Sequence, residues 1–152
     1  MSSVKPVPDG YHTITPMLCV NNADRLQTFL ESAFDATLIH RHDRPDGKIM
    51  HAELRVGDSR VMLSEAAEPQ PPMPACFYLY VPDIDATHRQ AVDAGGESLM
   101  PPADMFWGDR SASVKDPAGN LWWISTHIED VDDDELARRA ASQAECGGQS
   151  PQ

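Results

Sequence analysis

The fold is decided by a stretch that occurs twice, first as Met17-Leu18-Cys19-Val20-Asn21-Asn22 and again as Tyr78-Leu79-Tyr80-Val81-Pro82-Asp83. Each copy is a short apolar run of the kind that forms a strand. A helical pattern follows each run, over 23–34 in the first case and 84–94 in the second. An internal repeat of this kind predicts two copies of one structural unit.

The helix boundaries carry their own signals. Asn22 and Asp83 stand directly before the two helices, and both residue types are suited to N-capping. Gly95-Gly96 follows the second helix and can take the left-handed conformation that ends helices. We therefore expect the same strand-to-helix connection in both halves.

Three further strand-like segments follow each helix, separated by turn signals rich in Gly, Pro, Asp and Asn. They lie at 37–42, 48–56 and 60–65 in the first half and at 97–100, 110–115 and 121–127 in the second. The sequence thus predicts an α+β fold of two βαβββ modules. The expected parts are an N-terminal arm (1–10), the first module (11–66), a Pro-rich linker (67–74), the second module (75–128), an acidic segment with a short helix (129–142) and a disordered tail (143–152).

Composition and charge exclude several function classes. The chain has 152 residues, and 12 Lys and Arg against 24 Asp and Glu give a net charge of -12. Such a surface repels nucleic acid and anionic membranes. The 3 cysteines cannot all pair and show no zinc spacing, and no signal peptide or membrane span is visible. We expect a reduced, cytoplasmic protein with no nucleic-acid or membrane partner.

Strand alternation indicates a ligand cavity on one sheet face. The apolar residues of each strand share one phase and should pack under the helices. The opposite phase mixes aromatic, small polar and ionisable side chains, as ligand cavities do. Its members are Thr13, Thr15, Met17, Cys19, His51, Glu53, Arg55, Met62, Ser64, Cys76, Tyr78, Tyr80, Trp123, Ser125 and His127.

His51, Glu53 and Arg55 alternate along one predicted strand. In a functional interpretation, His51 exchanges a proton, Glu53 orients it or acts as the base, and Arg55 holds an anionic group. The alternative is a solvated strand face with cross-strand charge pairs.

Aromatic residues supply the candidate ligand-binding surface. Trp107 and Arg110 flank a turn that is expected to cap the cavity, where they suit a flat or anionic ligand. The alternative is that Arg110 pairs with a neighbouring aspartate and Trp107 fills a gap. Tyr78, Trp123 and His127 either contact the ligand or have structural roles, in which the two aromatic rings plug the cavity and the histidine bonds to the chain end.

Four motifs resemble one branch of a known superfamily. They are Gly10-Tyr11-His12-Thr13, Met50-His51-Ala52-Glu53-Leu54, Phe106-Trp107-Gly108-Asp109-Arg110 and Thr126-His127-Ile128-Glu129-Asp130-Val131. With the repeat and the Asp116-Pro117-Ala118-Gly119-Asn120 turn, they are similar to the PhnB-like branch of the vicinal oxygen chelate superfamily. That superfamily includes glyoxalase I, bleomycin-resistance proteins and extradiol dioxygenases.

The resemblance implies an open, barrel-like cup, commonly in a homodimer, and in many members a divalent metal. The metal positions fall on Thr15, Met62 (or Ser64), Cys76 and Trp123. These residue types are unsuitable as a divalent-ion ligand set, so we expect no metal cofactor.

Two functions remain open from the sequence. The first is a metal-independent protein that binds a small organic molecule, as bleomycin-resistance members do. The alternative is an enzyme, either a glyoxalase-like lyase or isomerase of the lactoylglutathione lyase type with an unusual metal site, or an acid/base catalyst that uses His51 and Glu53.

Overall fold

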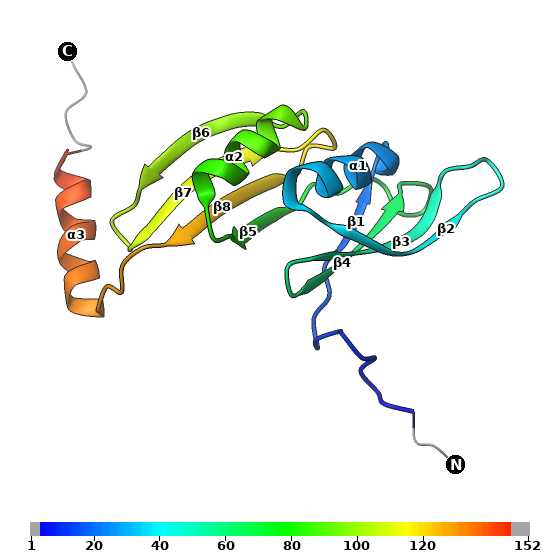
Figure 1. The fold of residues 1–152 in the computed structure, drawn as a ribbon, viewed down its shortest axis with the longest axis horizontal. Coiled ribbons are helices and arrows are strands. Elements are labelled where there is room, and N and C mark those ends of the chain that lie inside the picture. Colours follow the sequence, from blue (N-terminus) through cyan, green and yellow to red (C-terminus); the bar gives the residue numbers. More distant parts are fainter. Residues whose placement is uncertain (1–3, 147–152) are drawn as a thin grey trace.

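Two βαβββ modules follow one another in the chain, as Figure 1 shows for the computed structural model, which describes residues 4–146. The first contains β1 (Met17–Val20), α1 (Ala23–Phe34), β2 (Thr37–Asp43), β3 (Ile49–Val56) and β4 (Ser59–Glu65). The second contains β5 (Cys76–Tyr80), α2 (Ile84–Asp93), β6 (Glu97–Asp104), β7 (Asp109–Lys115) and β8 (Leu121–His127), and α3 (Asp133–Cys146) follows it. No helix of the described part of the chain is long and apolar enough to cross a membrane.

Both modules have the same sheet topology. The strand orders are β1-β4-β3-β2 and β5-β8-β7-β6. β1 runs parallel to β4 and β5 runs parallel to β8, while the other pairs are antiparallel. The sheets stay separate and do not close into a barrel. The predicted α+β fold of two βαβββ modules with an open architecture is therefore confirmed.

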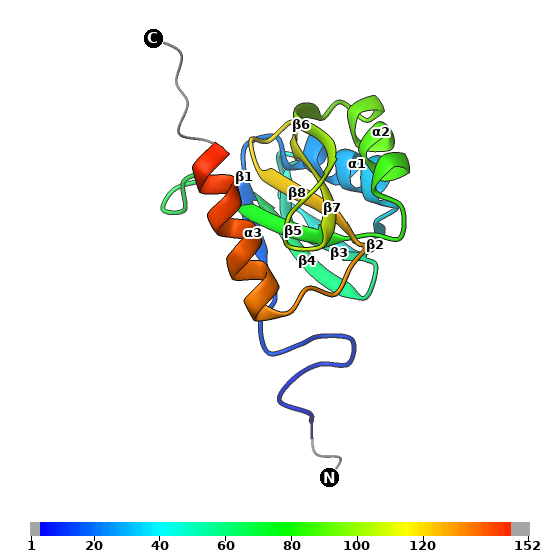
Figure 2. The same ribbon diagram turned by 90° about the vertical axis from the view of Figure 1, so that its left-hand side faces the viewer.

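One face of each sheet packs against its helix and forms the core. In β3, Ala52 and Leu54 are fully buried, and in β7 of the second module Ala112 and Val114 are their counterparts. Because side chains alternate along a strand, the neighbouring residues project from the other face, which we call the open face. α1 and α2 lie side by side over the same side of the two sheets (Figures 1 and 2).

The helices begin differently from one another. Asp83 caps α2 as predicted, since its carboxylate accepts the Ala86 N–H at 3.0 Å. Asn22 makes no side-chain cap and instead takes the left-handed conformation. In its place Glu65, from the last strand of the module, accepts the N–H groups of Ala23 (2.7 Å) and Asn22 (3.1 Å).

Thr126 occupies the corresponding place in the second module. Its hydroxyl accepts the Ile84 N–H at 2.9 Å and donates to the Val81 carbonyl at 2.8 Å. In both modules, therefore, the last strand holds the start of the helix.

We expect Glu65→Gln to lower the free energy of unfolding at pH 7 by about 1–2 kcal/mol, because a charged acceptor at a helix N-terminus is lost. Burial alone would raise the pKa of Glu65, but the two N–H groups and Lys48 outweigh it and hold the pKa below its ordinary 4.5. The carboxylate therefore stabilises the fold at neutral pH, and this contribution is lost as the pH falls below that value. Urea unfolding from pH 7 to pH 3 should show the difference between the proteins shrinking with acid; a constant difference would contradict this role.

The last turn before β8 is organised by a buried aspartate. Asp116, in the turn Asp116-Pro117-Ala118-Gly119-Asn120, accepts the backbone N–H groups of Ala118 (2.8 Å) and Asn120 (3.0 Å). Its second oxygen accepts the Asn120 amide (2.9 Å) and the Trp122 indole N–H (2.8 Å). This carboxylate therefore ties the turn to the core.

α3 lies beside the end of the second module (Figures 1 and 2). It ends at Cys146, later than the predicted 142, because 140–145 is rich in good helix formers. Arg139 attaches it to the module through the Phe106 carbonyl (3.2 Å) and the Glu129 carboxylate (2.7 Å). β6 also runs further than predicted, to Asp104. Residues 147–152 of the predicted tail lie outside the described residues.

Candidate functional site

A buried carboxylate lies on the open face of the second sheet. Asp109 is 3 % exposed, yet it faces the side of the sheet that no helix covers. It accepts hydrogen bonds from the hydroxyls of Tyr78 (2.8 Å) and Tyr80 (3.0 Å) and contacts His127 Nδ1 at 2.8 Å. We call these four residues the Asp109 centre. They come from β5, β7 and β8, whose alternation puts all four on one face.

Gly108 determines the path of the backbone directly before Asp109. Its φ of 97° is in the left-handed region, and its carbonyl accepts the N–H groups of Ile128 (2.9 Å) and Glu129 (3.0 Å). A Cβ at this position would lie 2.1 Å from the Glu129 carbonyl oxygen. Only glycine fits here, and the connection holds Trp107 and Asp109 in place on either side of it.

Hydrogen bonding keeps Asp109 ionised. Burial raises its pKa, but the contacts with His127, Tyr78 and Tyr80 outweigh burial, so the pKa lies below the ordinary aspartate value. The bond to Asp109 in turn raises the pKa of Tyr80. The two phenols thus act as proton donors to a fixed negative charge.

His127 lies between two carboxylates. Its Nε2 is 2.8 Å from Asp130 and its Nδ1 is 2.8 Å from Asp109. The contact with Asp130, followed by that with Asp109, raises the pKa of the imidazole above its ordinary 6.5. This arrangement favours the imidazolium, which can donate to both carboxylates at once.

Aromatic rings surround the Asp109 centre. Tyr78 stacks parallel to Trp123 with the ring centroids 6.5 Å apart, and it lies 5.2 Å from Tyr80. The Trp107 indole N–H donates to the Tyr78 hydroxyl at 3.3 Å. The structure therefore brings together Tyr78, Trp107, Trp123 and His127, four of the residues that sequence alternation and motifs selected.

The open face of the first sheet carries a second polar cluster. The Tyr11 hydroxyl donates to Glu53, and His51 Nε2 lies 3.2 Å from the other oxygen of that carboxylate. The bond from Tyr11 is the main cause that lowers the pKa of Glu53. Arg60 lies over the Tyr11 ring, 4.9 Å from its centroid. His51 and Glu53 are thus in contact as predicted, but a carboxylate with a lowered pKa is a weak general base at neutral pH.

Arg110 departs from its predicted role as a ligand contact. Its guanidinium contacts Asp85 of α2 at 2.8 Å and 2.9 Å and Asp104 at 2.9 Å. Because Asp109 faces the open side, the next residue along β7 faces the helix. Pairing with Asp104 is one of the alternatives that the sequence leaves open, whereas pairing with Asp85 has no signal in the sequence.

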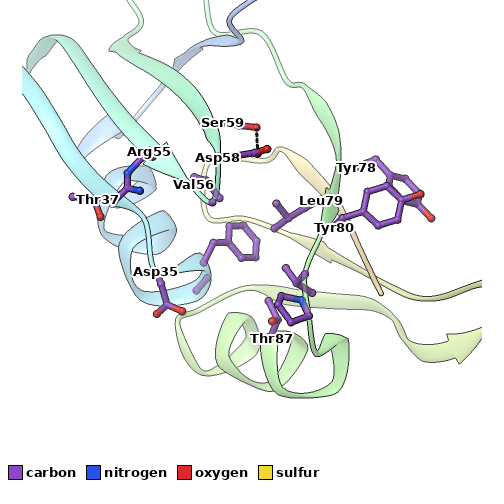
Figure 3. Close-up of a pocket in the computed structure, with 15 residues that line it drawn as sticks. Asp35, Thr37, Arg55, Val56, Asp58, Ser59, Tyr78, Leu79, Tyr80 and Thr87 are labelled. Atoms are coloured by element: carbon purple, nitrogen blue, oxygen red, sulfur yellow. Dashed lines mark hydrogen bonds between the residues drawn. The ribbon is translucent and has the colours of Figure 1, made fainter. Parts of the chain in front are cut away.

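A cavity of about 650 Å³ lies between the two modules (Figure 3). Arg55 and Thr37 line one side, and β5 lines the other. The rings of Tyr78 and Tyr80 lie together at the far side, away from Arg55 (Figure 3). Arg55 is therefore separated from the aromatic surface with which the sequence grouped it.

The positions equivalent to the superfamily's metal ligands do not fit a divalent ion. Thr15, Met62, Cys76 and Trp123 offer a hydroxyl, a thioether, a thiol and an indole, without a carboxylate or an imidazole. Within residues 4–146, no three His, Cys, Asp or Glu side chains are grouped so that they could hold a metal ion. As a set, the side chains at these four positions therefore do not suit a divalent metal.

Sequence reasoning misses two residues of these clusters. In the sequence, Asp109 is only part of a predicted turn. In the structure it is the first residue of β7 and pairs with His127 of β8, which puts it on the open face. Tyr11 lies in no regular element, and its contact with Glu53 depends on the path of the N-terminal arm. No periodic signal could have predicted that path.

Comparison with known proteins assigns the family. Residues 11–124 match the model of the Glyoxalase/Bleomycin resistance protein/Dioxygenase superfamily, and the chain belongs to this superfamily. An uncharacterized protein of Mycobacterium tuberculosis is 32 % identical over 143 residues, which cover 87 % of this chain and 84 % of that protein.

Solved structures share the fold. TioX from Micromonospora sp. ML1 is 27 % identical, with a TM-score of 0.67 over 77 % of this chain and 99 % of that one. TnmS3, an antibiotic binding protein from Streptomyces sp. CB03234, is 19 % identical, with a TM-score of 0.62 over 76 % of this chain and 95 % of that one.

Proposed function

We propose that this protein binds a flat organic molecule on the aromatic open face of the second sheet, without a divalent metal. The observation that carries the proposal is the gathering of aromatic side chains over the Asp109 centre. Tyr78 and Tyr80 are 46 % and 62 % exposed, so both side chains are accessible to a ligand. Their hydroxyls are fixed by Asp109, so the rings offer a preorganised stacking surface.

The family supports ligand binding over any one reaction. TnmS3 is described as an antibiotic binding protein and shares this fold. The four motifs around Tyr11, His51, Trp107 and His127 further support a place among the PhnB-like members of the superfamily.

We propose the homodimer expected of that branch, because the exposed rings on the open face suit burial in an assembly.

Proflavine, a flat tricyclic dye, tests the binding proposal. We expect it to bind and to quench tryptophan fluorescence in the presence of EDTA, because stacking needs no metal. Trp107→Ala and Trp123→Leu should each weaken binding by about 2- to 12-fold, which corresponds to the 0.5–1.5 kcal/mol of an aromatic pair. Tyr11→Phe is the matched control, since the Tyr11 hydroxyl contacts Glu53 on the first sheet, away from the proposed site. Equal affinity in all variants, or binding abolished by EDTA, would contradict the proposal.

An acid/base enzyme is the second candidate, and the contact of His51 with Glu53 favours it. In that case His51 would take the proton and Glu53 would orient it. A methylglyoxal–thiol turnover assay of wild type and His51→Gln decides this point. Turnover that depends on His51 would support an enzyme, and the absence of turnover in the wild type would leave ligand binding as the function.

A further inference from the structure

The open face of the first sheet is a basic surface on an acidic chain. In the register of the sheet, Arg55 lies directly opposite Arg60, His42 opposite His51, and His40 opposite Glu53. Glu53 is already bound by Tyr11 and His51. We call the five basic side chains, His40, His42, His51, Arg55 and Arg60, the basic patch.

In the described part of the chain, the two arginines of the basic patch have no carboxylate partner. On the helix side, Arg41 contacts Asp24 (2.8 Å) and Asp43 (2.7 Å), and Arg110 is paired in the same way. Within residues 4–146, no carboxylate lies within 4.0 Å of Arg55 or Arg60. Like charges directly opposite each other on a sheet are unfavourable. An external anionic group between Arg55 and Arg60 would remove this cost.

The start of α3 presents the opposite charge. Asp133 and Asp134 lie in its first turn, are exposed, and have no Lys or Arg nitrogen within 4.0 Å in the described part of the chain. The Asp130 side chain is fully exposed except for its contact with His127. The nearby Arg139 is not available to them, because it is held by Glu129 and Glu135. We call Asp130, Asp133 and Asp134 the acidic turn.

The two charged surfaces cannot meet within one chain. The second sheet lies between α3 and the first module (Figure 1). α3 also leaves most of its surface free, since the side-chain hydrogen bonds that join it to the second module in the described structure run through Arg139. An acidic segment that stands clear of its own module is free to reach another molecule.

We infer that the acidic turn of one copy docks on the basic patch of a second copy. The inference rests on the homodimer of the proposed function and adds the residues that hold the dimer together. Twofold symmetry would form the contact twice. Guanidinium groups and imidazole N–H groups are the donors that suit carboxylates. Each copy thereby supplies the counter-charge that the other lacks.

A charge swap tests this pairing. In sedimentation equilibrium, Arg55→Glu/Arg60→Glu should raise the dimer dissociation constant by about tenfold or more, because several charge pairs become repulsive. Asp133→Arg/Asp134→Arg should do the same. The protein that carries all four changes should return to within about threefold of the wild type, since the charges again match. Raising the salt concentration should weaken the wild-type dimer.

Matched controls separate this contact from a general charge effect. Arg25→Glu/Arg89→Glu makes the same charge change on the helix side and should leave the dissociation constant unchanged. Circular dichroism checks that every variant is folded, and Arg55→Gln/Arg60→Gln is a milder form of the patch substitution.

A dimer that is insensitive to the patch changes, or not restored by the fourfold variant, overturns the inference and leaves the proposed dimer standing. A wild type that is monomeric throughout overturns both.

Discussion

Replacing Asp116 by Ala should lower the free energy of unfolding by about 3–5 kcal/mol, one of the two largest effects that we expect in this protein. The carboxylate is 3 % exposed and accepts four hydrogen bonds. Its removal leaves the indole N–H of Trp122 and the amide of Asn120 buried without their acceptor. Each such orphaned group costs about 1–3 kcal/mol. Urea unfolding monitored by tryptophan fluorescence measures the loss.

Asp58→Ala is the matched control for this prediction. Asp58 also lies in a turn between two strands, but it is exposed and bonds only to the neighbouring Ser59 hydroxyl (3.1 Å) in the described structure. We expect its loss to cost less than about 0.5 kcal/mol. Similar losses for the two variants would show that burial and the four bonds of Asp116 are not what stabilises the turn.

Gly108→Ala is expected to have a comparable effect, about 3 kcal/mol or more, and to affect the site as well. The φ of 97° disfavours any side chain, and the new Cβ would lie 2.1 Å from a backbone oxygen of Glu129. The backbone must move, and Trp107 and Asp109 would move with it. We therefore expect both a lower melting temperature and weaker proflavine binding.

Gly119→Ala separates the two costs of that substitution. Gly119 has a similar φ of 93°, but no atom lies within 4 Å of the position that a Cβ would take there. It should show only the conformational cost, about 1 kcal/mol, with proflavine binding unchanged. Equal losses in the two alanine variants would argue that the contact with Glu129 does not shape the site.

The repeat made the fold predictable from sequence. Strand phase placed Leu63 and Ile124 in the core and Tyr78 and Trp123 on the open face, because alternation is a local property of a strand. The predicted cap of α1 was wrong, because Asn22 is a good cap by residue type and its competitor, Glu65, is distant in the chain. Pairings between separate elements, such as Arg110 with Asp85, have no local signal and could not be predicted.

The site, too, was predictable where local signals decide it and not where it depends on pairing between separate elements. Strand alternation and the sequence motifs selected Tyr78, Trp107, Trp123 and His127. They did not select Asp109, the carboxylate that organises this group. Asp109 became a candidate only when the register of β7 with β8 showed its contact with His127. Arg55 was grouped with the aromatic residues by strand alternation alone. In the structure it lies on the first sheet, apart from the aromatic residues of the second sheet.

The link between each last strand and the start of its own helix bears on how the chain folds during synthesis. Glu65 is the final residue of β4, and it both completes the pairing with β1 and accepts the first N–H groups of α1. Until this residue has left the ribosome, the nascent first module lacks the end of its sheet and the acceptor for its helix. In the second module, Thr126 of β8 has the same role at the start of α2. The sheet of each module and the start of its helix are therefore completed only when the module's own C-terminal strand has been made.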